Sequence, residues 1–244
     1  MPDILGYDHA LGVITPSGNL VVERVTIGFL RDVPNVSAHF SRSPVFGTRD
    51  AFPDGYDLDG MLGAARLLAH AKPDAIFWSG SKGGAIGMAH DVDLKRRIED
   101  ATGIPATTSF LALPAAMARL GATRLALVTP YAEAYQRRLL DTFAREGIEV
   151  VAESHLGLTD NLSYAAVAPD VIARQIAEVM PARPDAVLTW CTNYAGAVAA
   201  QAAEASHGVP VLDAVTLPLW QVLGELGCAL PPAAARWGRL FAPR

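Results

Sequence analysis

The stretch PDAVLTWCTNYAGAV, residues 184–198, has a counterpart about half a chain earlier, PDAIFWSGSKGGAI, residues 73–86. Both begin with Pro-Asp-Ala and an apolar run, and from Ser79 and Cys191 onward they align without a gap at an offset of 112 residues. Two more matches follow in the same order along the chain: LGVITP (11–16) with LALVTP (125–130), and GIPATTS (103–109) with GVPVLDA (208–214). Three ordered matches indicate a duplicated four-strand unit, and they make chance likeness between ordinary strands the weaker explanation.

Short apolar runs alternate with helical patterns along the whole chain. Strands are expected at residues 11–15, 36–42, 75–78, 106–108, 125–128, 150–154, 186–189 and 209–212. Helical patterns cover residues 58–71, 94–102, 113–120, 132–146, 171–180 and 195–206. Several strands are apolar at consecutive positions, which suits strands buried on both faces of a parallel sheet. The alternation predicts an α/β fold.

The repeat divides the chain into two similar α/β halves. We expect residues 1–115 to form the first half, completed by a C-terminal helix over residues 216–244, and residues 116–215 to form the second. In open α/β sheets, ligands bind beyond the carboxyl ends of the strands. If the two halves face each other, Ser79 and Cys191 are expected on opposite walls of one cleft.

Composition narrows the possible partners. The 244 residues are 51% hydrophobic and 18% charged, which is typical of a globular protein. The net charge is −5, without a basic patch of the kind that nucleic acids bind. No long uncharged apolar window predicts a membrane span, and the N-terminus lacks the features of a signal peptide. With only two cysteines, we expect a cytoplasmic protein with reduced thiols, and a homo-oligomer remains open.

Two strand-end loops carry groups that could bind an anion or exchange a proton. The loop SGSKGG (79–84) is rich in small residues, and its backbone N–H groups can hold an anion or simply form a tight turn. It matches neither a phosphate-binding loop nor a dinucleotide fingerprint. Cys191 follows a strand and precedes a helix, where a thiol can exchange a proton near neutral pH. Cys228 is interpreted as a small buried hydrophobe.

Polar residues in other loops could bind an anionic substrate. Asn19 and Tyr131 lie in the matching first-strand loops of the two halves, and Asn161 lies in the loop TDNLSY (159–164). The alternatives are a helix cap for Asn19 and for the Asp160–Asn161 pair, and a packed ring for Tyr131. The six histidines show no metal-ligand spacing, and no cofactor motif is present, so neither a metal nor a cofactor is expected.

These motifs together resemble the Asp/Glu/hydantoin racemase superfamily, in the branch of maleate isomerase and arylmalonate decarboxylase. The resemblance is carried from about residue 11 to 227 by GVITPSGNLVVE, GTRDAFPDGYD (47–57), TGIPATTSFLAL, LALVTPYAEAYQRRL and CTNYAG. It implies a flavodoxin-like fold of two pseudo-symmetric halves with the active site between them. It further implies that Cys191 and Ser79 flank the substrate. The residues that would bind a small carboxylate are Asn19, Gly80, Ser81, Tyr131, Asn161 and Thr192.

The racemases and isomerases of this superfamily use one cysteine from each half, whereas the decarboxylases keep only the second. A serine hydroxyl is a much weaker acid than a thiol unless a base activates it. The expected reaction is therefore decarboxylation of a 2-substituted malonate-type acid, with Cys191 protonating the enediolate. A maleate-type cis–trans isomerase or a racemase is the alternative, and a non-catalytic binder of small acids is the third possibility. On this alignment, Ser79→Cys is expected to restore a two-thiol site.

Overall fold

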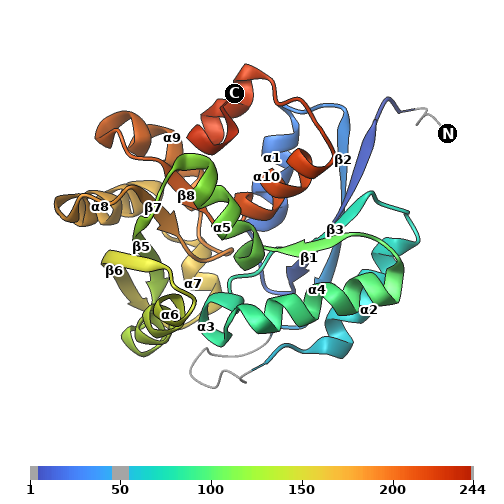
Figure 1. The fold of residues 1–244 in the computed structure, drawn as a ribbon, viewed down its shortest axis with the longest axis horizontal. Coiled ribbons are helices and arrows are strands. Elements are labelled where there is room, and N and C mark those ends of the chain that lie inside the picture. The colour runs from blue at the N-terminus through green and yellow to red at the C-terminus, as the bar shows by residue number, and fades with distance from the viewer. Residues whose placement is uncertain (1–4, 46–54, 243–244) are drawn as a thin grey trace.

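The computed structural model describes residues 5–45 and 55–242, and its two sheets each contain four parallel strands (Figure 1). The first sheet has the order β2-β1-β3-β4 and the second the order β6-β5-β7-β8, so the order repeats. The strands are β1 (His9–Pro16), β2 (Val36–Ser43), β3 (Ala75–Trp78), β4 (Ala106–Thr108), β5 (Arg124–Tyr131), β6 (Glu149–Leu158), β7 (Ala186–Thr189) and β8 (Val211–Asp213). The predicted α/β class with two four-stranded parallel halves is confirmed.

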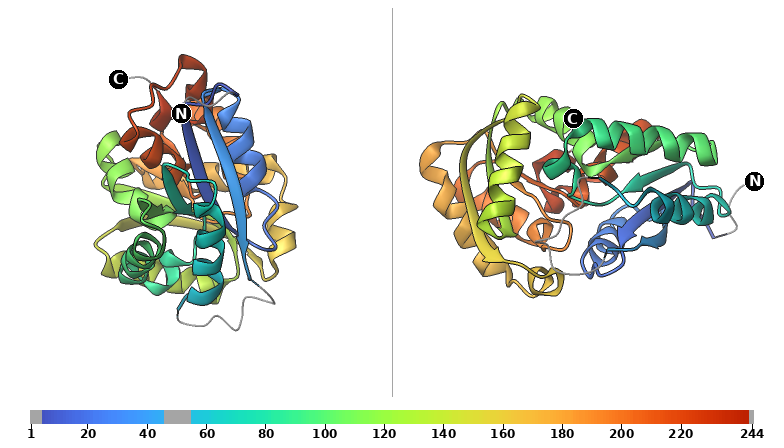
Figure 2. Two further views of the ribbon diagram at one scale, coloured as in Figure 1. Left: turned by 90° about the vertical axis from the view of Figure 1, so that its right-hand side faces the viewer. Right: turned by 90° about the horizontal axis from the view of Figure 1, so that it is seen from below.

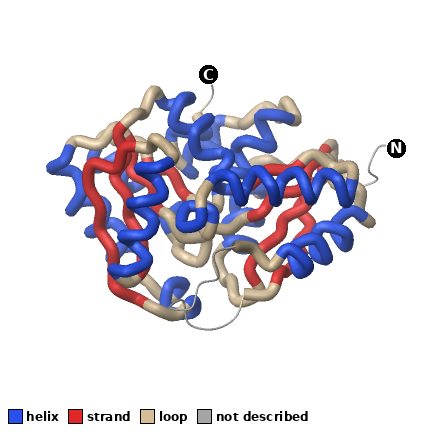
Figure 3. Tube along the Cα trace, turned by 60° about the horizontal axis from the view of Figure 1, so that its bottom comes forward, coloured by secondary structure: helices blue, strands red, loops and turns tan. Residues whose placement is uncertain are grey.

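The helices lie around the sheets, as Figures 2 and 3 show. They are α1 (Val22–Leu30), α2 (Leu58–Ala69), α3 (Gly83–Ile86), α4 (Met88–Thr102), α5 (Ser109–Leu120), α6 (Glu133–Arg145), α7 (Asn161–Ala165), α8 (Pro169–Val179), α9 (Gly196–His207) and α10 (Thr216–Glu225). All six helical patterns correspond to helices, although α4 and α5 begin earlier than expected. Helices α1, α3 and α7 were not predicted.

The C-terminal segment corrects one expectation. The helix expected over residues 216–244 ends at Glu225, because Gly227 adopts a left-handed conformation with φ of 70° and two prolines follow at 231 and 232. Two 3-10 turns, η3 (Pro232–Trp237) and η4 (Arg239–Phe241), take its place. Helix α10 packs against α1, α5, β3 and β4 of the first half and against β8 of the second. The assignment of this segment to the first half stays a prediction.

The aspartate of the Pro-Asp-Ala motif makes the same hydrogen bonds in both halves. The backbone N–H groups of Asp74 and Asp185 each donate to a carbonyl in the neighbouring first strand, that of Ala10 or Arg124, at 2.8 Å. Their carboxylates accept hydrogen bonds from the backbone N–H groups of the same two residues, at 2.8 and 2.9 Å. These bonds fix where β3 and β7 begin, and they make the two strands equivalent from their first residue.

Counting from these fixed starts corrects the alignment at the strand ends. Trp78 pairs with Ile14 and Thr189 pairs with Val128 in the two sheets. The next residues donate to those same partners: Ser79 N to Ile14 O at 2.9 Å, and Trp190 N to Val128 O at 3.0 Å. Ser79 therefore corresponds to Trp190, and Gly80, not Ser79, corresponds to Cys191. The second half has one more residue than the first between Pro-Asp-Ala and the shared Gly-Ala pair. The strand hydrogen bonds place this residue after Cys191, whereas the sequence comparison placed it before Cys191.

One hydrophobic core runs through both halves. It includes Leu11 and Phe29 from the first half, Leu127 and Trp190 from the second, and Leu219 of α10. A smaller cluster lies under α2 and α4 and contains Trp78. Because the large core is continuous, the strand ends of the two sheets are held in a fixed relation to each other.

Candidate active site

The carboxyl ends of the two sheets meet at a set of buried loops. These loops follow β1, β3, β5 and β7, and the start of α7 joins them. The Trp190 indole N–H donates to the Ser81 carbonyl at 2.9 Å, which ties the β7 loop to the β3 loop. Phe110 and Phe143 pack against the same indole, with ring centroids 5.6 and 5.7 Å away. The two loops that carry Gly80 and Cys191 are therefore in direct contact.

A pair of hydroxyls from the two halves lies at this junction. The Ser81 Oγ and the Tyr131 hydroxyl are 2.8 Å apart, and both side chains are buried. The Tyr131 ring packs edge-on against Tyr135 and Tyr164, with centroids 4.6 and 5.3 Å away. The packing expected of this ring and the polar role of its hydroxyl thus occur together. Either hydroxyl can turn its proton toward an anion placed beside the pair.

Three asparagines form a clasp between the halves. The Asn193 Oδ1 accepts from the Leu20 N–H at 2.8 Å, and its Nδ2 donates to the carbonyls of Gly18, at 3.5 Å, and Asn161. The Asn161 Nδ2 also donates to the Gly18 carbonyl, at 3.0 Å. The loop after β1 is consequently fastened to the loop after β7, and the amide group of Asn161 serves this clasp.

Asn19 has two functions in this clasp. Its Oδ1 accepts from the N–H groups of Val21 and Val22, each at 2.8 Å, so the helix-cap alternative holds for this residue. Its Nδ2 points across to the Thr192 Oγ1 at 3.4 Å, a long hydrogen bond between buried side chains. The cap fixes the side chain, and it leaves the amide N–H group facing the residue that follows Cys191. Asp160, by contrast, is a simple cap of α7.

Cys191 is 1% exposed, and a buried carboxylate supports the end of its strand. Asp213, at the end of β8, accepts from the Thr189 Oγ1 at 2.7 Å and from the Val215 N–H at 2.9 Å. Burial raises the pKa of Asp213 to about 6, although these hydrogen bonds favour the charged form. Thr189 lies two residues before Cys191, so this interaction helps to fix the backbone that carries the thiol.

The first half contains a similar support built from other residues. Asp91, at the start of α4, accepts from the Tyr56 hydroxyl at 2.5 Å and from the Thr108 Oγ1. Burial raises the pKa of Asp91 to about 6 and, together with the charge of Asp91, raises the pKa of Tyr56 well above its usual value. Ser79 lies nearby in the chain, and its buried Oγ makes no hydrogen bond to any described residue.

Cys228 lies at the other end of the first sheet. Its pKa is raised by partial burial and then by the charges of Asp74 and Asp8, two residues that precede β3 and β1. These carboxylates mark the amino ends of the strands, whereas the clasp lies at the carboxyl ends. No disulfide joins Cys228 to Cys191.

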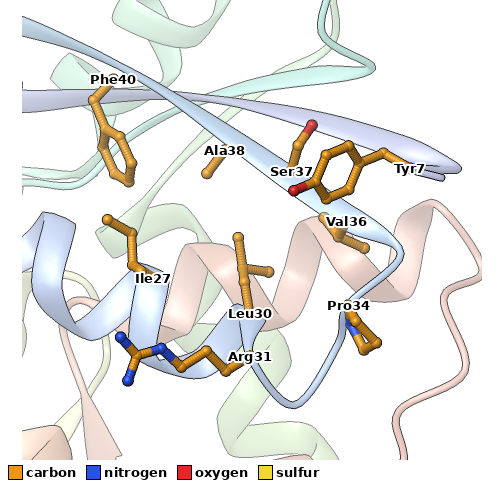
Figure 4. A pocket seen from close by; sticks show the side chains of 9 residues that line it. All are labelled: Tyr7, Ile27, Leu30, Arg31, Pro34, Val36, Ser37, Ala38 and Phe40. Carbon is orange, nitrogen blue, oxygen red and sulfur yellow. The ribbon is translucent and has the colours of Figure 1, made fainter. Parts of the chain in front are cut away.

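A groove elsewhere on the molecule contains none of the predicted site residues. It runs between α1 and the edge strand β2, and Tyr7, Ile27, Leu30 and Phe40 point into it (Figure 4). Within residues 5–45 and 55–242, no three His, Cys, Asp or Glu side chains come together as a metal site would require. In the same part of the chain, no helix is both long and apolar enough to cross a membrane. Most of the predicted motif over residues 47–57 lies outside the described residues.

The structure adds residues that the sequence reasoning missed. Asn193, Trp190, Asp213 and Asp91 all hold the loops of the site, and none was singled out before. Asn193 directly follows Thr192, so its position was available, but its partners are far away in the chain. Asp213 had a usable signal, because it is a lone carboxylate at the end of an apolar strand.

We predict that Asn193→Ala lowers the free energy of unfolding by about 1–3 kcal/mol, because it removes the Asn193 bonds of the clasp and leaves the Leu20 N–H without its acceptor. The matched control is Asn35→Ala, since Asn35 donates to Asp8 at the solvent-exposed amino end of the sheet. The control is expected to cost less than the Asn193 change. Urea unfolding monitored by circular dichroism measures both, and equal losses would contradict the clasp.

We also predict a pH-dependent contribution from Asp213. Its pKa is raised in the folded state, so the protonated side chain stabilises the fold below its ordinary pKa, and this stabilisation is lost as the pH rises through about 6. The stability of the parent relative to Asp213→Asn should therefore fall by up to about 3 kcal/mol between pH 4 and pH 7. Urea unfolding of both proteins across this range tests it, and a constant difference would show that Asp213 does not titrate there.

Known proteins match this chain in sequence and in fold. The sequence model of the family described as arylmalonate decarboxylase matches residues 41–241. Arylmalonate decarboxylase of Bordetella bronchiseptica is 25% identical over 236 residues, which cover 95% of each protein. Maleate isomerase of Alcaligenes faecalis is 30% identical over 130 residues, which cover 53% of this chain and 51% of that protein.

A crystal structure confirms the architecture. It is a liganded variant of arylmalonate decarboxylase in which one glycine is replaced by cysteine and one cysteine by serine. Its TM-score is 0.82 at 24% identity, over 96% of this chain and 98% of that one. Since the family match spans most of the sequence, the resemblance inferred from the motifs is confirmed, and this chain belongs to the arylmalonate decarboxylase family, whose matched relatives are decarboxylases and maleate isomerases.

Proposed function

We propose that this protein is a cofactor-independent decarboxylase of a 2-substituted malonate-type acid, with Cys191 as its single proton donor. The proposal rests on one observation: Gly80 and Cys191 occupy equivalent positions just past the ends of β3 and β7. A glycine offers no group that can exchange a proton. Arylmalonate decarboxylase also has a glycine and a cysteine at the two positions exchanged in its crystallised variant.

Ser79 does not supply the missing second group. Its hydroxyl is buried and makes no hydrogen bond to any described residue, so none of them acts as a base upon it. A hydroxyl without such a base is a poor proton acceptor at neutral pH. We therefore assign Ser79 no role in proton transfer, which departs from the expectation drawn from the sequence alignment.

The anion is held by groups from both halves. The Ser81 and Tyr131 hydroxyls, 2.8 Å apart, take one carboxylate, together with the backbone N–H groups of residues 80–81. The Asn19 Nδ2 and the Thr192 Oγ1, which already face each other, extend this set toward Cys191. Asn161 acts indirectly, because its amide holds the Gly18 carbonyl.

The reaction consumes one proton and moves one electron pair. The bond between the substituted carbon and one carboxylate breaks, CO2 leaves, and the electron pair passes into an enediolate on the remaining carboxylate. Hydroxyl and N–H donors stabilise the developing oxyanion. The Cys191 thiol then gives its proton to the carbon, and the thiolate is reprotonated from solvent. The product is the 2-substituted monocarboxylate, protonated from one face.

Burial of the site favours the loss of CO2. Cys191, Ser81, Tyr131 and Thr192 are all at most 4% exposed, so a bound substrate loses most of its contact with water. A departing carboxylate that meets no hydrogen-bond donors gains by becoming neutral CO2, while the retained carboxylate is held by the donor set. The two carboxylates of a malonate would thus have different environments.

A maleate-type cis–trans isomerase, or a racemase of the same superfamily, is the second candidate. It is favoured by the amide groups of Asn19 and Asn193 beside Thr192, which suit a dicarboxylate, and by the isomerase relative. It ranks lower because the Asn193 amide is engaged in the clasp and because Gly80 leaves Cys191 without a second group that exchanges protons. A protein that only binds small acids would keep the anion site without turnover.

We predict that a panel of phenylmalonate, 2-alkylmalonates, maleate and L-amino acids identifies the reaction by proton NMR in D2O. Decarboxylation yields a monocarboxylate with one deuterium on the α-carbon, isomerisation yields fumarate, and racemisation exchanges the α-proton of an amino acid. We expect the first signature alone. Fumarate formation would favour the isomerase, and no change in any compound would favour the binder.

We predict that Cys191→Ala lowers the turnover of the malonate substrate by at least about a hundredfold, the usual scale for losing a general acid. Two matched variants serve as controls. Ser79→Ala and Cys228→Ala should retain most of the parent rate, since neither group is assigned to proton transfer. Steady-state CO2 release measures all three. If Ser79→Ala were as inactive as Cys191→Ala, the single-thiol mechanism would be wrong.

A further inference from the structure

The side chain of Trp78 covers Gly80. A Cβ atom built on Gly80 would fall 2.1 Å from Cε2, 2.3 Å from Cζ2 and 2.4 Å from Nε1 of the Trp78 indole. Carbon atoms that are not bonded to one another pack at about 3.5–4.0 Å. The indole therefore fills the space that any side chain at residue 80 would need, and its nitrogen is among the atoms in that space.

The space beside Gly80 corresponds to the space that the Cys191 side chain fills in the second half. Gly80 and Cys191 follow β3 and β7 at equivalent positions, each one residue past the last ladder hydrogen bond. A side chain at residue 80 would leave the first half as the Cys191 side chain leaves the second. The Trp78 ring therefore lies where a first-half acid–base group would be.

Among the described residues, the buried indole N–H of Trp78 has no acceptor in hydrogen-bond geometry. Trp78 is 2% exposed, and its Nε1 makes no hydrogen bond to any described residue. The indole N–H lies close enough to the Tyr56 hydroxyl to lower the Tyr56 pKa, as a donor would, although burial and the charge of Asp91 outweigh this effect. The two groups do not meet the geometry of a hydrogen bond, and the Tyr56 hydroxyl itself donates to Asp91 at 2.5 Å. An unsatisfied buried N–H costs about 1–3 kcal/mol, so such groups are rare unless a ligand or water completes them.

The ring is fixed in this position by packing. Met61, Leu68 and Leu94 from α2 and α4 belong to the same small core as Trp78. The Tyr56 ring meets the indole edge-on, at a centroid distance of 6.2 Å and an interplanar angle of 83°. The packing thus fixes the ring in one position before any ligand binds.

We propose that Trp78 contacts the substrate from the side opposite Cys191 and donates its indole N–H to the carboxylate that the product retains. This inference rests on the proposed function, because it takes the site and the carboxylate substrate from it. An indole N–H is a donor only and does not exchange protons near neutral pH. Trp78 therefore binds and covers the first-half face of the substrate, and proton delivery is confined to Cys191.

The binding test uses phenylmalonate and the Cys191→Ala protein, in which the ligand is not consumed. Adding Trp78→Phe removes the N–H and keeps most of the ring, so calorimetry should show a dissociation constant raised about tenfold or more, as for a lost hydrogen bond to a charged group. Without ligand, Trp78→Phe should lower the free energy of unfolding less than Trp237→Phe does. The Trp237 indole donates to Asp32 at 2.9 Å, so its replacement breaks a hydrogen bond within the protein.

The control variant reverses this pattern. Trp237→Phe should lose stability and leave the affinity for phenylmalonate unchanged, because Trp237 lies on η3 beside α1, away from the strand ends. An unchanged affinity in Trp78→Phe, with binding intact in the parent, would overturn the proposed contact. Loss of phenylmalonate binding in every protein, the parent included, would count instead against the proposed substrate class.

A second measurement tests the position of the ring without any substrate. In a background with both native cysteines replaced by alanine, Gly80→Cys should be strongly destabilising, because Trp78 occupies the space. Combining it with Trp78→Leu should restore stability and yield a thiol that reacts with iodoacetamide. If Gly80→Cys alone were stable and equally reactive, the indole would not hold this position, and the proposal would fail whatever the substrate is.

Discussion

The hydrogen bonds that close β3 and β7 decide which residues reach the active site. The N–H groups of Ser79 and Trp190 each bind a carbonyl of the central strand, and the next residue in each half is the first that leaves the sheet. A shift of one residue in a strand sends every side chain to the opposite face. With this register, the thiol of Cys191 has a glycine as its counterpart, and Trp190 is directed into the core, where its indole holds the Ser81 carbonyl.

The two halves support their strand ends with the same chemistry but different residues. In the second half, Asp213 ends β8 and accepts a hydrogen bond from Thr189 of β7. In the first half, Thr108 ends β4 and donates to Asp91, which lies on a helix. A buried carboxylate bonded to a threonine thus occurs in each half, but it joins β7 to β8 in the second half and β4 to α4 in the first. The two halves therefore use the same kind of interaction at different positions.

The sequence predicted what depends on local pattern. Apolar runs between turns located the eight strands, and the position of Cys191 after such a run was enough to single it out. The register at the strand ends was missed because the sequence comparison aligned similar residues around Ser79. In the structure the register is set by the hydrogen bonds of the Pro-Asp-Ala motif, at the start of each strand. Contacts such as Asn193 with Leu20, or Trp78 with Gly80, depend on side-chain direction in space. Helix α7 has only five residues, too few to show a helical period.

The contact between Trp78 and Gly80 also limits how this site can change. A second thiol facing Cys191 needs a side chain at residue 80, and the indole excludes every such side chain while it stays in place. Replacing Trp78 first would empty a space packed by α2 and α4, at a cost of about 3–5 kcal/mol for a large-to-small change. Each single change is thus unfavourable alone, and only a coupled replacement keeps the packing. The proposed one-thiol chemistry is therefore protected by the core beneath it, and a change toward two-thiol chemistry would have to pass through residues 78 and 80 together.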